Sequence, residues 1–244
     1  MRPRGVLVAV LMAATGAHAQ TADVTQWSGD IGVNIERTQA SAPGAAARTW
    51  VLPYAYGDIG RVFVREDTFG MKLVPIGWGA LELAARISTE GRDSDGPGLS
   101  HRSDPRPVGL GTFQETPWGG FFVDAFIDTN SGGMLLEASY AAEVRLGALT
   151  VYPQAGVIRR SARYNAHLYG VSASEARATG EGAYAPGASM TPLLQLSAEL
   201  PICDTWVGLT HVQVESFDRA LRDSPRVVVR SRVSALLALA WHFK

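Results

Sequence analysis

The sequence has one cysteine and no long apolar run, and each absence excludes a class of protein. Cys203 has no second cysteine with which to form an intramolecular disulfide. It also lies far from any signal-cleavage site, which excludes a lipoprotein anchor. Beyond the N-terminal segment no stretch reaches ~18 consecutive apolar residues, so no membrane-spanning helix is predicted. The chain can therefore enter a membrane only as a closed barrel, which satisfies all its backbone hydrogen bonds in lipid.

An excess of positive charge is also absent. The chain carries 22 basic and 23 acidic residues, which gives a formal net charge of −1. A nucleic-acid-binding protein needs a concentrated basic face. We therefore expect no nucleic-acid partner.

Motifs for chemistry are missing as well. The sequence contains no Gly-x-Ser-x-Gly elbow, no metal-spaced His/Cys cluster and no phosphate loop. Among the five histidines, only His211 lies on the inward face of a predicted strand, with Gln213 and Glu215. Such same-face neighbours are ~6.6–6.8 Å apart along a strand, too far for a direct hydrogen bond from their backbone positions alone. We predict no catalytic, cofactor-binding or metal-binding residues; an outer-membrane hydrolase is the least favoured alternative.

The N-terminus is typical of a secretory signal. Arg2 and Arg4 precede an apolar core from Val6 to Ala14, and Ala17-His18-Ala19 matches the small-x-small cleavage pattern. We therefore predict a signal peptide over residues 1–19 and one β-barrel domain over residues 20–244. Removal of the two arginines leaves 20 basic against 23 acidic residues, a net charge near −3.

The stretch from Val227 to Phe243 alternates with a strict period of two, which predicts a β-strand with an apolar and a more polar face. It exceeds the ~9–11 tilted residues that a transmembrane strand needs. Trp241 and Phe243 would lie in an interfacial aromatic girdle. By itself this strand fits the last strand of a soluble β-sandwich equally well. The predicted lipid-facing residues are Val227, Val229, Val233, Ala235, Leu237, Leu239, Trp241 and Phe243.

The spacing of the other strands favours the membrane barrel. Long polar gaps follow the first, fifth, ninth and eleventh strands, which places them all on one rim of an up-and-down barrel, while the remaining connections are short. Short turns on one rim and long loops on the other are typical of outer-membrane barrels. We therefore predict an all-β, antiparallel up-and-down transmembrane β-barrel of about twelve strands. The first eleven are Trp27 to Arg37, Arg48 to Ala55, Gly60 to Glu66, Phe69 to Val74, Gly77 to Ser88, Pro107 to Thr116, Phe121 to Asp128, Met134 to Leu146, Leu149 to Arg160, Leu193 to Ile202 and Trp206 to Phe217.

Charged side chains recur on the predicted inward faces. They can form a plug of salt bridges that makes the barrel rigid, or they can line a narrow pore. Both signs of charge occur, which favours the plug, because a selective pore usually shows one dominant sign. The predicted lumen charges are Asp30, Glu36, Glu82, Arg86, Asp124, Glu137, Glu143, Arg145, Glu199, Glu215, Arg230 and Arg232.

The segment Tyr164 to Gly187 carries a family resemblance. It resembles the aromatic-Tyr-Gly-Val-Ser … Ala … Gly … Tyr … Gly signature of the MipA/OmpV family, the MltA-interacting outer-membrane proteins. Leu52-Pro53-Tyr54-Ala55-Tyr56 and Leu221-Arg222-Asp223-Ser224-Pro225 agree with this resemblance. The signature residues are Tyr169, Gly170, Val171, Ser172, Ala176, Gly180, Tyr184 and Gly187.

The resemblance implies a structural or scaffolding role in the Gram-negative outer membrane, linking a murein hydrolase and a murein synthase. Other relatives are porin-like or adhesin-like, so a narrow channel for small solutes is the main alternative and an adhesin a further one. The expected partners are outer-membrane lipid, the barrel-assembly machinery and these murein enzymes.

Within the signature segment, Ser172 followed by Glu175 is a capping-box pattern and predicts the start of a helix. This segment can fold inward and constrict the lumen, or it can cover the rim. Its small residues offer few anchors for a ligand, so we predict a structural lid.

Overall fold

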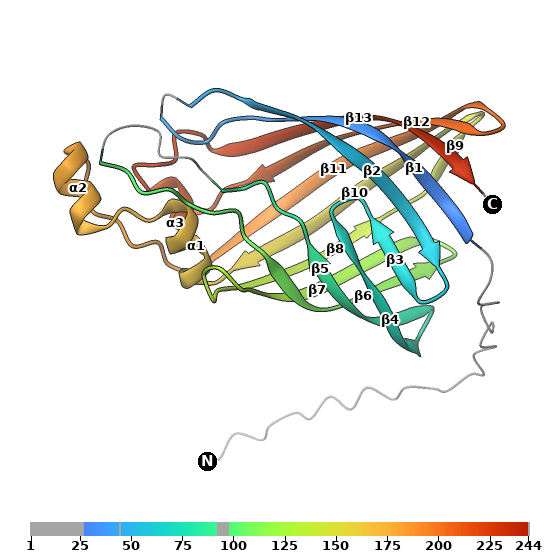
Figure 1. Cartoon of the computed structure of the whole chain (residues 1–244), viewed down its shortest axis with the longest axis horizontal. Helices are drawn as coiled ribbons and strands as arrows, with labels where there is room; N and C mark the ends of the chain where they lie inside the picture. The colour runs from blue at the N-terminus through green and yellow to red at the C-terminus, as the bar shows by residue number, and fades with distance from the viewer. Residues whose placement is uncertain (1–26, 44, 92–97, 244) are drawn as a thin grey trace, which may run out of the picture.

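The computed structural model describes residues 27–43, 45–91 and 98–243, and the predicted signal peptide lies outside them. Its core is one antiparallel sheet that closes on itself (Figure 1). The closing strands are β1 (Trp27–Thr38) and β13 (Ser231–Phe243), which pair over ten residues from Gly29↔Phe243 to Thr38↔Ser234. Closure leaves no free edge where the two ends of the sheet meet, as a membrane barrel requires.

The sheet contains thirteen strand segments. Two of them, β8 and β9, keep one register against β10, from Gln154↔Ala141 to Val151↔Val144. They are thus two parts of a single wall strand, and the predicted count of twelve is confirmed. The remaining segments are β2 (Arg48–Ile59), β3 (Val62–Arg65), β4 (Thr68–Ile76), β5 (Gly79–Arg86), β6 (Pro107–Thr116), β7 (Gly119–Asp128), β8 (Met134–Ala141), β9 (Val144–Leu146), β10 (Leu149–Arg160), β11 (Ser189–Cys203) and β12 (Trp206–Ser216).

The break between β8 and β9 corrects the prediction of one continuous strand from Met134 to Leu146. The backbone N–H of Ala142 donates to the carbonyl of Pro153 on β10 at 3.0 Å. Pro153 has no N–H to donate in return, so the ladder loses one hydrogen bond at this point. The wall is interrupted there without changing register.

All three helices of the described part lie at one end of the barrel, opposite the C-terminus (Figure 1). They are α1 (Ala162–Tyr169) and α2 (Ala173–Thr179) in the connection between β10 and β11, and α3 (Arg219–Arg222) in the connection between β12 and β13. None of them is long and apolar enough to cross a membrane. The predicted asymmetry between long-loop and short-turn rims is confirmed, whereas α1 and α3 were not predicted from the sequence.

The facing predicted for β13 is confirmed along the strand itself. Leu237 is 64% exposed, whereas its neighbour Leu236 is 5% exposed and lies in the lumen. The outward side chains form an apolar belt that is suited to lipid. Its members include Ile31, Val33, Ile35, Val123, Leu194, Leu196, Val212, Leu237, Leu239 and Trp241.

The start of the last strand was predicted wrongly. β13 begins at Ser231, and Val227, which was expected to face lipid, is buried against the inner apolar cluster. Hydrogen bonds from the Val227 N–H to Ser224 O (3.0 Å) and from the Val228 N–H to Ser41 O (2.8 Å) hold this segment away from β12. Arg230, predicted to point into the lumen, lies before the strand and is exposed.

The outer mouth of the barrel is closed by an apolar cluster. Tyr164 and Leu168 of α1 and Leu221 of α3 reach into it and are almost fully buried. Strand residues meet them from below, so the long-loop end of the lumen is filled rather than open. The strand members include Phe126, Leu135, Ile158 and Leu193.

We expect Leu237→Arg to destabilise the folded barrel by ~2–4 kcal/mol, because it puts a charge on the lipid face near mid-strand. Leu237→Phe is the control, since it keeps this face apolar. Urea titration in lipid vesicles, followed by the heat-dependent gel shift, measures the effect. Equal stability of the two variants would mean that Leu237 does not face lipid.

Candidate functional site

Four charged side chains meet in the outer half of the lumen. Arg160 on β10 contacts Glu215 on β12 through Nη1 and Oε1, and it contacts Glu90 through Nη2 and Oε1 at 3.2 Å. Arg232 on β13 contacts the same two carboxylates at 2.7 and 2.5 Å. Two arginines thus face two glutamates, and the cluster has no net charge. We call these four residues the lumen ion cluster.

One member of the lumen ion cluster, Glu90, belongs to the β5–β6 loop, so this loop enters the barrel. Glu90 lies beyond the end of β5 and also accepts a hydrogen bond from the Tyr164 hydroxyl of α1 at 3.0 Å. Burial raises the pKa of Glu90, but the charges of Arg232 and Arg160 outweigh burial and lower the pKa to about 2. Glu90 therefore remains a carboxylate and ties the β5–β6 loop and α1 to the barrel wall.

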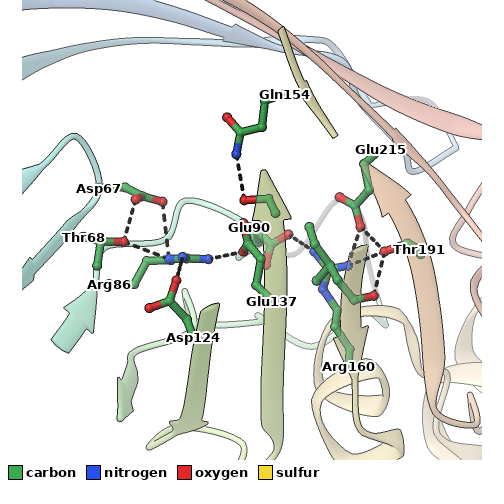
Figure 2. Close-up of polar contacts among 12 residues, drawn as sticks. Asp67, Thr68, Arg86, Glu90, Asp124, Glu137, Gln154, Arg160, Thr191 and Glu215 are labelled. Carbon is green, nitrogen blue, oxygen red and sulfur yellow. Dashed lines mark hydrogen bonds and ion pairs between the residues drawn. The ribbon is translucent and has the colours of Figure 1, made fainter. Parts of the chain in front are cut away.

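A second group surrounds Arg86 on β5 (Figure 2). Its guanidinium lies 2.7 Å from Glu137, 3.5 Å from Asp124 and 3.7 Å from Asp67. Its Nε also donates to the Thr68 hydroxyl at 3.0 Å. Three carboxylates from β7, β8 and the β3–β4 turn thus share one arginine across the lumen.

A third pair completes this side. Arg65 on β3 donates from both terminal nitrogens to Glu82 on β5, at 2.9 Å each. The same guanidinium lies over the rings of Phe63 and Phe113, at 4.2 and 4.9 Å from their centroids. Such bidentate, stacked arginines are geometrically specific.

The other predicted lumen charges lie away from these groups. Asp30 contacts His242 at 2.9 Å, and Glu199 accepts a long hydrogen bond from the Tyr152 hydroxyl at 3.4 Å. Glu143 and Arg145 pair with each other at 2.5 Å on the short-turn rim. They continue the inward alternation of β8, but both side chains are exposed at the rim.

Sequence reasoning missed Arg65, Glu90 and Arg160. Arg160 was detectable, because it continues the inward alternation of Tyr152, Gln154 and Ile158 along β10. Glu90 was not, since it belongs to no strand and its direction is set by the two arginines that it meets.

His211 lies opposite Glu66 of the β3–β4 turn, with Nδ1 and Oε2 3.6 Å apart. It does not contact Glu215, whose carboxylate is bound by Arg160 and Arg232. Because Arg160 and Arg232 come from β10 and β13 and meet the carboxylate of β12, the arrangement is suited to holding strands together. Within the described ranges, no group of three or more His, Cys, Asp or Glu side chains is arranged to hold a metal ion.

The signature segment folds over the outer rim. The helix start predicted at Ser172 is confirmed, with the reciprocal capping box to Glu175. Arg102 of the β5–β6 loop binds the Glu175 carboxylate at 2.8 Å, and the Ser100 N–H donates to it at 3.1 Å. Burial raises the pKa of Glu175, but hydrogen bonds from Ser172 and Ser100 and the charge of Arg102 outweigh it and lower the pKa to about 2.

The other signature residues fix this segment to its neighbours. The carbonyl of Tyr169 accepts from the Ser224 hydroxyl at 2.6 Å, and the Tyr184 hydroxyl donates to Ala220 O at 3.1 Å. Val171 pairs with Tyr184 as an isolated β-bridge. The remaining members are Gly170 and Gly180, which end α1 and α2, Ala176, whose carbonyl accepts from the Gly180 N–H, and Gly187, whose carbonyl accepts from Asn165.

Comparison with known families decides the assignment. The family model described as MltA-interacting protein MipA matches residues 31–243. The chain belongs to this family. Together with the closed barrel and its apolar belt, this makes the protein an outer-membrane β-barrel of the MipA family.

Two relatives from Escherichia coli (strain K12) are similar to this MipA-family chain. "Putative outer membrane protein YiaT" is 23% identical over 221 residues, which cover 87% of this chain and 90% of the relative. "MltA-interacting protein" is 30% identical over 131 residues, which cover 53% of each chain.

Solved structures give weaker likenesses. The anion-selective porin from Comamonas acidovorans matches with a TM-score of 0.33 and 7% identity, over 89% of this chain and 99% of the porin. OmpT of Vibrio cholerae matches with a TM-score of 0.37 and 7% identity, over 93% of this chain and 100% of OmpT. The assignment of this MipA-family barrel therefore depends on the family match.

Removing one arginine from the lumen ion cluster should be costly. Arg160 is 3% exposed, so Arg160→Met leaves Glu215 and Glu90 under-compensated in a buried site, and we expect a loss of about 3–5 kcal/mol. Arg145→Met is the matched control, because Arg145 is 79% exposed and its pair is worth about 1 kcal/mol or less. Urea unfolding in lipid vesicles measures both. Equal midpoints would contradict a stabilising role for the cluster.

The contacts of Glu175 that hold the signature segment over the rim should weaken in acid. The folded-state pKa of Glu175, about 2, lies below its ordinary value of 4.5, so its stabilising contribution is complete above pH 4.5 and is lost as the pH falls toward 2. A fluorophore on Arg177→Cys, in a Cys203→Ser background, should report this transition. Glu175→Gln should abolish the transition in that window. An unchanged titration in this variant would assign the transition to another group.

Proposed function

We propose that this protein is a non-catalytic scaffold that holds a murein hydrolase, together with a murein synthase, at the inner face of the outer membrane. The observation that carries the proposal is a lumen bridged by paired charges and capped by α1, which favours a rigid body over a solute path. The printed name of one relative, "MltA-interacting protein", supports a link to a murein hydrolase.

The short-turn rim is the face that a periplasmic partner would meet. Trp78 and Trp118 stand on two neighbouring turns there and are 59% and 69% exposed. Their rings meet edge to face, with centroids 5.8 Å apart. Aromatic residues are enriched in protein interfaces, so we assign the first contact with the hydrolase to this pair.

Co-purification from crosslinked cell envelopes tests the proposal. The wild-type protein should recover a murein hydrolase, and the Trp78→Ala/Trp118→Ala variant should recover several-fold less while keeping its heat-dependent gel shift. Trp50→Ala, on the opposite rim, is the matched control. In planar bilayers the wild-type protein should show no steady conductance. Discrete, reproducible openings, with no hydrolase recovered, would favour the alternative of a narrow channel.

A further inference from the structure

The barrel wall has a free strand edge on its outer half. β2 has twelve residues, but β3 has only four and pairs with β2 from Tyr56↔Arg65 to Ile59↔Val62. One further hydrogen bond joins the Glu66 N–H to Ala55 O at 3.1 Å. In the described part of the chain, no strand pairs with residues 48–54 of β2 on the side away from β1. Figure 1 shows the short β3 beside the long β2.

The direction of the backbone groups follows from this last hydrogen bond. N–H and C=O groups of alternate residues in a strand point to the same side. Because Ala55 O points toward the β3 side, the backbone groups of Thr49, Val51 and Pro53 point there too. Pro53 has no N–H, so this edge offers two donors and three acceptors. Backbone groups without a strand partner are costly in an apolar environment, so this edge favours a polar ligand.

The edge lies where the apolar belt ends. Val51 is the cross-strand neighbour of Ile35, and both face outward. Thr49 is the neighbour of Arg37, which continues the outward face of β1 and donates to the Thr49 hydroxyl at 3.2 Å. An outward arginine directly above an apolar pair places this edge at the depth of lipid headgroups.

A second arginine bounds the gap from above. Arg48 reaches across to the β5–β6 loop, where its Nη1 donates to the carbonyl of Gly91 at 2.7 Å. The gap is thus framed by β2, by the β3–β4 turn at Glu66 and by this side chain. The Arg37 guanidinium and two backbone N–H groups stand on its lipid-facing side, and all of them are donors suited to an anion. Arg48 is the cross-strand neighbour of Thr38 and belongs to the inward face, where it bounds the gap.

We infer that this free edge of β2 binds a phosphorylated lipid of the outer leaflet. The phosphate lies against Arg37 and the N–H groups of Thr49 and Val51, and the acyl chains lie along the belt. A docking strand from another protein fits less well, because Pro53 interrupts its ladder. A second copy fits less well too: all copies have one orientation in the membrane, so their β2 strands cannot run antiparallel.

Photo-crosslinking identifies the occupant. Val51 is replaced by p-benzoyl-phenylalanine, and Ile35, its cross-strand neighbour on the same face, is the control site. After extraction and washing in non-ionic detergent, irradiation should add the mass of a phosphorylated lipid at position 51, at least ~5-fold more than at position 35. A peptide adduct would mean strand addition and overturn the inference. Equal adducts at both sites, or none, would also overturn it.

A binding assay tests the charge. Arg37→Gln should weaken binding of lipid A in detergent micelles about three- to tenfold, the worth of one charge-assisted contact, and Arg37→Lys should restore part of it. Arg159→Gln is the matched control, because Arg159 is exposed at the outer end of β10, which pairs on both sides. Dephosphorylated lipid A should bind weakly, and inorganic phosphate alone should not compete. Equal losses at Arg37 and Arg159, or no loss, would contradict the inference.

Discussion

The buried charge balance inside the barrel organises the rest of the molecule. Arg160 and Arg232 come from two wall strands, and each would be strongly unfavourable inside the lumen without a carboxylate partner. Glu215 supplies one partner from the wall, and Glu90 supplies the other from a loop. Glu90 must lie in the lumen to make this contact, so the β5–β6 loop lies there too. The Tyr164 hydroxyl of α1 donates to the same carboxylate, which holds α1 at this end of the barrel.

This arrangement separates the two ends of the barrel. The long-loop end is sealed by apolar side chains above the ion cluster, and the signature segment is fixed over it through Glu175 and Arg102. The short-turn end carries exposed indoles and paired rim charges. A rigid interior with exposed indoles on the short-turn rim suits a protein that positions other proteins, which is the role we propose.

The short β3 is a departure from a uniform wall. β3 pairs with only four residues of β4, and β2 loses its partner above Tyr56. Pro53 has no N–H, so this edge of β2 has one unpaired donor fewer. Arg37 places the edge at headgroup depth, where the remaining backbone groups can meet polar partners. The same segment therefore completes the barrel below and offers a lipid site above.

The sequence alone determined the class of fold, because lipid outside and polar groups inside impose a period of two on every wall strand. It also determined which rim carries the long loops, and it placed Glu137, Glu215 and Arg232 in the lumen. It could not determine that Val227 turns inward, that α1 caps the mouth or that Glu90 enters the barrel. Those positions depend on partners that are distant in the chain: Arg232 is 142 residues from Glu90, and no local pattern records such a contact. The alternation of residues shows which face of a strand meets lipid and which faces the lumen. Only the closed barrel determines which charged side chains in the lumen meet.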